Sequence, residues 1–84
     1  MIKEKIVAYL RNINPVLLEE VEEIGSLKIT EIIDSLGILE FIVFLEESFS
    51  IDIQDANITS ENFNSIDSLT TFIQDLLTSN NNKD

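Results

Sequence analysis

The side chains of this chain that could do chemistry are mainly hydroxyls and carboxylates, because it has no histidine and no cysteine. Histidine is the commonest general base and metal ligand, and cysteine is the usual thiol nucleophile and soft-metal ligand. Only two glycines occur, which excludes a glycine-rich phosphate-binding loop. An enzyme would have to use carboxylates, lysines, hydroxyls and one tyrosine, which is a possible but narrow set. We expect a protein that is not an enzyme and that binds no metal.

One tripeptide, Asp-Ser-Leu, occurs twice, at residues 34–36 and 67–69. The second copy falls inside an apolar stripe at helical spacing, so we interpret Ser68 as an exposed serine within a helix. The first copy lies where a long irregular segment becomes a helix. A phosphate ester on Ser35 would face the free N–H groups of the first helical turn. An ordinary N-cap role for Asp34 or Ser35 explains the position equally well.

The first half of the chain must position Ser35. Apolar residues recur at helical spacing from Ile2 to Ile13, and Asn14-Pro15 ends this predicted helix because the residue before proline avoids helical backbone angles. A long irregular segment follows up to Ile33, in which Leu17, Val21 and Ile24 favour a short helical turn. Four apolar residues in its second part are expected to pin it to the core: Leu27, Ile29, Ile32 and Ile33.

The second half is expected to contain two long helices. Residues 35–48 are apolar over a length that favours a helix, and residues 66–77 carry a stripe at helical spacing, with Asn64 or Ser65 as its cap. Between them, residues 59–62 suit a single helical turn capped by Thr59 or Ser60. The sequence thus predicts an all-α fold, a small antiparallel four-helix bundle with three main helices, one short helix and a long loop between the first two helices. The domain is expected to span residues 1–78, with a disordered polar tail at 79–84.

The charge of the chain is strongly negative, at −11, and from Ile29 to Asn82 it has ten acids and no base. Such a field repels nucleic acid and anionic lipid and attracts basic protein surfaces. The N-terminus has no apolar signal region, and no run of about 18 apolar residues could cross a membrane. We therefore expect a cytoplasmic monomer with no membrane span and no nucleic-acid partner.

The surroundings of the first tripeptide resemble a known family. Residues 31–40 (Glu-Ile-Ile-Asp-Ser-Leu-Gly-Ile-Leu-Glu), 44–53 (Phe-Leu-Glu-Glu-Ser-Phe-Ser-Ile-Asp-Ile) and 58–66 (Ile-Thr-Ser-Glu-Asn-Phe-Asn-Ser-Ile) are together similar to the acyl carrier proteins, especially the free-standing carriers of bacterial pathways. The similarity covers residues 31–73 by motif and about residues 2–77 by pattern. It implies a four-helix bundle with a long first loop and a short third helix.

The resemblance also implies a covalent cofactor. A phosphopantetheinyl transferase would transfer 4′-phosphopantetheine from coenzyme A to Ser35, making a phosphoprotein that carries acyl groups as thioesters in lipid metabolism, either fatty-acid or secondary-metabolite biosynthesis. Asp34 and Leu36 would belong to the surface that the transferase recognises. The second helix would dock acyl-loading and acyl-transferring enzymes through basic surfaces of those enzymes. The implied docking residues are Leu36, Leu39, Glu40, Val43, Glu46 and Glu47.

Other functions compete with this one. The cargo of a carrier could be aminoacyl or peptidyl, and the same acidic helix could serve an unmodified protein-interaction module. A calcium site around Asp52 and Asp55 is disfavoured, because the spacing lacks the alternating ligands, glycine and glutamate of an EF-hand loop. A hydrolase built on carboxylates is the weakest alternative, since many acids without a histidine fit a solvated surface better.

Overall fold

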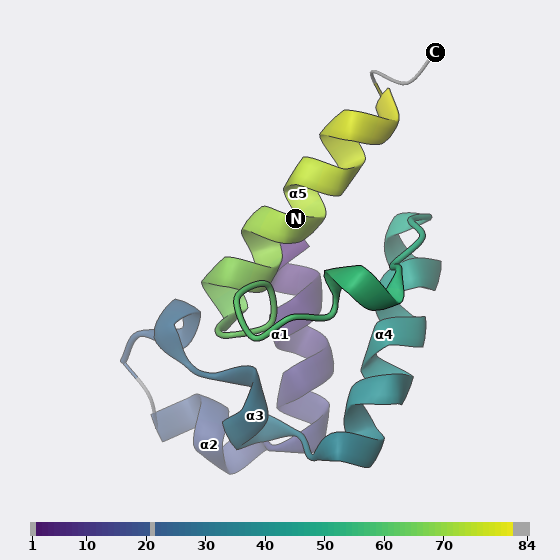
Figure 1. Ribbon diagram of the computed structural model, residues 1–84. Coiled ribbons are helices and arrows are strands. Elements are labelled where there is room, and N and C mark those ends of the chain that lie inside the picture. Colours follow the sequence, from purple (N-terminus) through teal and green to yellow (C-terminus); the bar gives the residue numbers. More distant parts are fainter. Residues whose placement is uncertain (1, 21, 82–84) are drawn as a thin grey trace.

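A computed structural model describes residues 2–20 and 22–81 of the chain (Figure 1). The three main helices are α1 (Ile2–Ile13), α4 (Ser35–Phe49) and α5 (Ile66–Asn81). Short helices lie between them: α2 (Pro15–Glu20), the 3₁₀ turn η1 (Ile24–Ser26), α3 (Ile29–Ile32) and the 3₁₀ turn η2 (Asp55–Asn57). The protein is all-α, and the described residues form no β-strand.

The predicted end of the first helix is confirmed, but a second helix begins directly after it. The N–H of Asn14 donates to the carbonyl of Leu10 at 2.9 Å, which closes α1, and the Asn14 side chain accepts from the N–H of Leu17 at 3.2 Å, which caps α2. Pro15 occupies the first position of α2, where its missing N–H costs nothing. Ile24 lies in the separate turn η1, and Val21 lies outside the described residues.

The long segment between α1 and α4 is tied to the start of α5. The N–H of Ile29 donates to Asn64 at 3.2 Å, and the N–H of Ile66 donates to Leu27 at 3.1 Å, which gives an isolated antiparallel bridge between Lys28 and Ser65. The four predicted anchors are buried, with exposed fractions of 8% or less. The end of this segment, which leads into α4, is therefore fixed.

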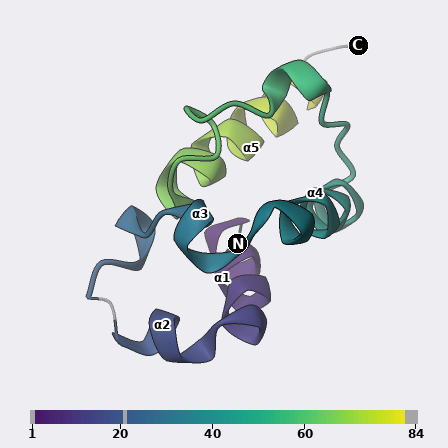
Figure 2. The same cartoon turned by 60° about the horizontal axis from the view of Figure 1, so that its bottom comes forward.

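The core is formed by one face of each main helix together with these anchors. Ile6 and Leu10 of α1, Phe41 and Leu45 of α4, and Ile73 of α5 are fully buried. Tyr9 stacks on Phe41 with ring centroids 5.2 Å apart and on Phe44 at 4.3 Å, so aromatic side chains join α1 to α4. Figure 1 shows α4 running opposite to α1. In both views α1 lies between α2 and α4 (Figure 2).

The segment from α4 to α5 confirms part of the prediction. Ile51 and Ile53 are buried on either side of the exposed Asp52, and a helical turn closes where Phe63 N–H donates to the Thr59 carbonyl at 3.0 Å. Thr59 caps this turn by accepting from Asn62 N–H at 3.1 Å. The turn η2 was not predicted.

The last helix is longer than the sequence indicates. The spacing predicts its end near residue 77, but α5 continues to Asn81, because residues 78–81 contain no proline or glycine that would break it. Three residues of the expected disordered tail are thus helical, and residues 82–84 lie outside the described residues.

Candidate functional site

The residue that caps α4 is Asp34, the neighbour of Ser35. Ile32 and Ile33 are buried, which anchors the chain immediately before the helix. Asp34 is extended, with φ −92° and ψ −174°, and its side chain accepts a hydrogen bond from Gly37 N–H at 2.8 Å. Asp34 is therefore the N-cap, and Ser35 is the first residue of α4.

The Ser35 hydroxyl is exposed and forms no hydrogen bond with any other residue that the structure describes. It borders an open hollow of about 370 Å³, whose other lining residues are Thr30, Ile33, Asp34 and Ile38. The first N–H groups of a helix have no partner within the helix and carry partial positive charge. An anionic group esterified to Ser35 would thus lie in open space and near favourable charge.

The second copy of the tripeptide has the opposite character. Ser65 caps α5 by accepting from Ser68 N–H at 3.1 Å, and the two serine hydroxyls lie 3.1 Å apart. Ser68 is half-buried and hydrogen-bonded, and not exposed as the sequence suggested. Asp67 pairs with Lys3 at 3.1 Å. In the second copy, Ser68 and Leu69 are thus partly or fully buried, and Asp67 is exposed but paired with Lys3.

The two leucines differ even more clearly. Leu36 is 78% exposed, whereas Leu69 is completely buried. Leu36 begins an exposed apolar stripe that continues with Leu39 and Val43, which are 62% and 50% exposed. Such side chains on a small protein gain little by facing water, so a contiguous set of them indicates a contact surface.

The predicted docking residues share one side of α4. At about 100° per residue, the six side chains from Leu36 to Glu47 fall within roughly 120° of the helix circumference. Glu40 and Glu47 are exposed beside the apolar stripe. Glu46 differs, because it is half-buried and its carboxylate accepts a hydrogen bond from Ile53 N–H at 2.9 Å. Glu46 therefore also holds the segment after α4 in place.

The remaining features of this face are electrostatic. Glu40 lies close enough to Tyr9 to influence its ionisation: burial raises the pKa of the Tyr9 hydroxyl, and the negative charge of Glu40 raises it further.

Two residues that line the hollow at Ser35, Thr30 and Ile38, were not predicted as part of the site. Their only signal is proximity in sequence to the tripeptide, which does not show where they point.

Comparison with known proteins adds no family assignment. No protein-family model, no curated protein and no solved structure matches the chain significantly. Among the described residues, no helix is long and apolar enough to cross a membrane. Within the same ranges, no three histidine, cysteine, aspartate or glutamate side chains gather in a way that could hold a metal ion. The case for a function therefore depends on the residues of the site.

Proposed function

We propose that the protein is an acyl carrier that holds its cargo on a 4′-phosphopantetheine arm attached to Ser35. The observation that carries this proposal is the difference between the two tripeptides. Ser35 is exposed and has no hydrogen-bond partner in the described chain, whereas Ser68 is engaged by Ser65. A transferase can reach only the first hydroxyl without displacing an existing contact.

The chemistry suits a protein without a thiol. Ser35 Oγ would form a new bond to phosphorus as the pyrophosphate of coenzyme A is cleaved, releasing adenosine 3′,5′-bisphosphate and the hydroxyl proton. The arm supplies the thiol that the chain lacks, so the thioester chemistry belongs to the cofactor and to partner enzymes. The protein itself would not be an enzyme. Its contribution is to hold Ser35 at the end of a rigid helix.

The face of α4 supports transient partners. Its apolar stripe of Leu36, Leu39 and Val43 offers contact area, and Glu40 and Glu47 offer charge for basic surfaces. Charged contacts raise association rates, and a small interface dissociates readily, as serial handover requires. We propose that the transferase and the acyl-loading and acyl-transferring enzymes dock here. The wider proposal is a monomeric, cytoplasmic protein with an antiparallel four-helix bundle; the opposed directions of α1 and α4 support the antiparallel arrangement (Figure 1).

The test is a modification assay on purified protein. Incubation with coenzyme A and a phosphopantetheinyl transferase should add the mass of one arm. Ser35→Ala should abolish the gain and Ser68→Ala, the matched control from the second tripeptide, should keep it. No gain with several transferases of different specificity would refute the proposal. The acyl group, or an aminoacyl or peptidyl group, would then be identified by intact mass of protein from its native cell.

A second function is favoured by one observation. The apolar stripe on α4 is exposed in the chain without any attached group, so the chain could act as an unmodified interaction module for a basic partner. That function predicts that Ser35→Ala leaves partner binding intact while Leu39→Asp abolishes it. A carrier instead loses delivery of cargo in Ser35→Ala.

A further inference from the structure

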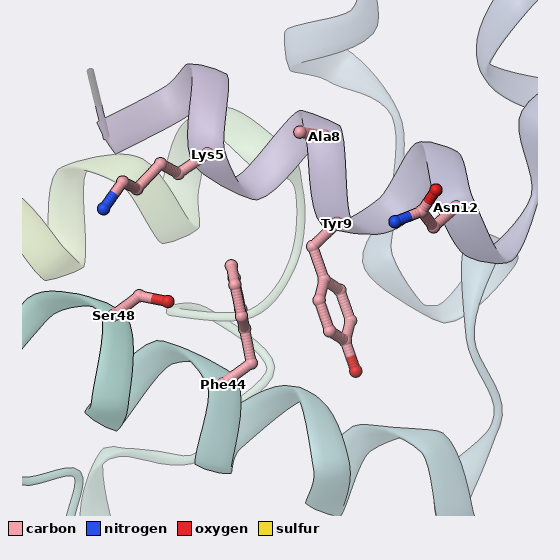
Figure 3. Close-up of a pocket in the computed structure, with 6 residues that line it drawn as sticks. All are labelled: Lys5, Ala8, Tyr9, Asn12, Phe44 and Ser48. Carbon is pink, nitrogen blue, oxygen red and sulfur yellow. The ribbon is translucent and has the colours of Figure 1, made fainter.

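A second site on the molecule lies between α1 and α4. An open groove of about 300 Å³ is lined by residues from both helices, and Figure 3 shows the six of them: Lys5, Ala8, Tyr9, Asn12, Phe44 and Ser48. The four from α1 are spaced as i, i+3, i+4 and i+7, and the two from α4 as i and i+4. Each set therefore lies on one face of its helix.

The groove is lined by two aromatic rings and by the small side chain of Ala8. The rings of Tyr9 and Phe44, stacked 4.3 Å apart, lie between the two helices, and Ala8 is on α1, one position before Tyr9 (Figure 3). Lys5 and Ser48 lie toward one end and Asn12 toward the other (Figure 3). The result is an aromatic surface that the protein itself does not cover completely.

Among the described residues, the polar groups around these rings have no ion-pair or hydrogen-bond partner, although the Lys5 ammonium lies over the ring of Phe49, 5.7 Å from its centroid. Lys5 has no carboxylate within ion-pair distance among the described residues, whereas Lys3, two positions earlier, pairs with Asp67 at 3.1 Å. The side chains of Ser48 and Asn12 likewise make no hydrogen bond within the described ranges. The Phe49 ring leaves the positive charge of Lys5 without an anion among the described residues, so an anionic group is the partner that this end of the groove would favour.

We propose that this groove binds a small aromatic carboxylate. Its ring would lie against Phe44 and Ala8, and its carboxylate would accept hydrogen bonds from Lys5 and Ser48. The opposite orientation is disfavoured, because Glu40 places negative charge near Tyr9. Ligand pockets commonly measure roughly 300–1,000 Å³, so this one suits one or two fused rings. The seven positions from Lys5 to Asn12 span about 10 Å, which agrees with that size.

This site is separate from the proposed attachment point. Phe44 is nine positions beyond Ser35, which places it on the opposite side of α4 at about 100° per residue. The inference therefore does not rest on the proposed function. It is tested with unmodified protein, and either proposal can fail without the other.

The test uses 2-naphthoate as the probe and its neutral analogue 2-naphthylmethanol as a comparison, titrated into the ¹⁵N-labelled chain. We expect saturable amide shifts centred on the six groove residues, with a Kd of about 1 mM for a ligand of this size. Lys5→Gln should weaken naphthoate about two- to fivefold, as removal of an exposed ion pair predicts, and leave naphthylmethanol unchanged.

A matched pair of variants tests the shape of the groove. Ala8→Leu should fill it and abolish binding of both probes, whereas Ala56→Leu, at an exposed alanine of η2, should bind as wild type. Shifts centred on Leu36 and Leu39, or binding that survives Ala8→Leu, would overturn the proposal. If Ala8→Leu does not fold, the proposal is tested by the affinities of Lys5→Gln for the charged and the neutral probe. An equal loss of affinity for both probes would overturn the proposal.

Discussion

Removal of the Asp34 side chain tests the geometry on which the accessibility of Ser35 depends. Asp34 accepts a hydrogen bond from Gly37 N–H at 2.8 Å. Its negative charge also interacts favourably with the partial positive charge at the N-terminus of α4. Asp34→Ala removes both interactions. Asp34→Asn keeps an oxygen that can accept the same hydrogen bond and removes only the charge.

The magnitudes separate the two variants. Loss of an N-cap acceptor costs about 1 kcal/mol, and loss of a charge at a helix N-terminus costs about 0.3–1 kcal/mol. We expect Asp34→Ala to lower the free energy of unfolding by about 1–2 kcal/mol and Asp34→Asn by less than about 1 kcal/mol. With a urea m-value of about 1 kcal/mol/M for so small a chain, the urea midpoint falls by about 1–2 M and less than about 1 M, respectively.

Urea unfolding followed by circular dichroism at 222 nm measures both effects, and Asp67→Ala is the matched control from the second tripeptide. Asp67 caps nothing and forms an exposed ion pair with Lys3, so its loss should cost less than about 1 kcal/mol and should cost less still in 1 M salt. If Asp34→Asn were as damaging as Asp34→Ala, or Asp67→Ala cost as much, the assignment of Asp34 as the cap would be wrong.

Two further predictions concern the aromatic cluster and the exposed stripe. Phe41→Ala removes a fully buried ring and should destabilise the fold by about 3–5 kcal/mol, whereas Leu36→Ala, at a 78% exposed position, should change stability by less than about 0.5 kcal/mol; urea midpoints test both, and a comparable loss in the two would contradict the packing. Tyr9 is the only tyrosine, so tyrosinate absorbance at 295 nm reports its pKa directly. We expect a pKa above the ordinary value of about 10, lowered but not fully restored by Glu40→Gln, because burial is the larger cause. Since the unfolded chain loses this proton first, the free energy of unfolding should fall as the pH rises from about 10 through the folded-state pKa, and Tyr9→Phe should remove that fall. A Tyr9 pKa at or below 10 would contradict the burial of this side chain.

The helices were the most predictable part of the fold, because their signals are local. The apolar spacing from Ile2 to Ile13 predicted the bounds of α1, and Ser65 was among the two caps proposed for α5. Asn14-Pro15 was harder to interpret. The pair ends one helix and begins the next, and only the first of these roles follows from the backbone restriction before proline.

Features that depend on distant residues could not be predicted. The bridge between Lys28 and Ser65 joins segments that are far apart in the sequence. Helix α4 ends at Phe49, and its cap residue, Ser50, has a left-handed backbone with φ 54°. Glycine usually occupies this position after a helix, so a serine there did not predict the end of the helix. The hydrogen bond from Ile53 N–H to Glu46 likewise gave no signal in the sequence, which placed Glu46 only on the docking face.

The candidate site shows the same division between local and distant information. The junction of loop and helix at Ser35 was visible in the pattern, but the sequence could not choose between Asp34 and Ser35 as the cap. The apolar stripe of the last helix placed Leu69 on the core side, which its complete burial confirms, whereas only the resemblance placed Leu36 on an exposed face.

The accessibility of Ser35 follows from which neighbour caps each helix. At α4 the residue before the serine supplies the cap by accepting from Gly37 N–H, and the Ser35 hydroxyl makes no hydrogen bond with the other described residues. At α5 the cap comes from Ser65, three positions before Ser68, and the two hydroxyls come within hydrogen-bonding distance of each other. The same three residue types therefore yield one free hydroxyl and one occupied hydroxyl, because the helix begins one residue after Asp34 but one residue before Asp67. A two-residue difference in register, and not the tripeptide itself, makes Ser35 the serine available for modification.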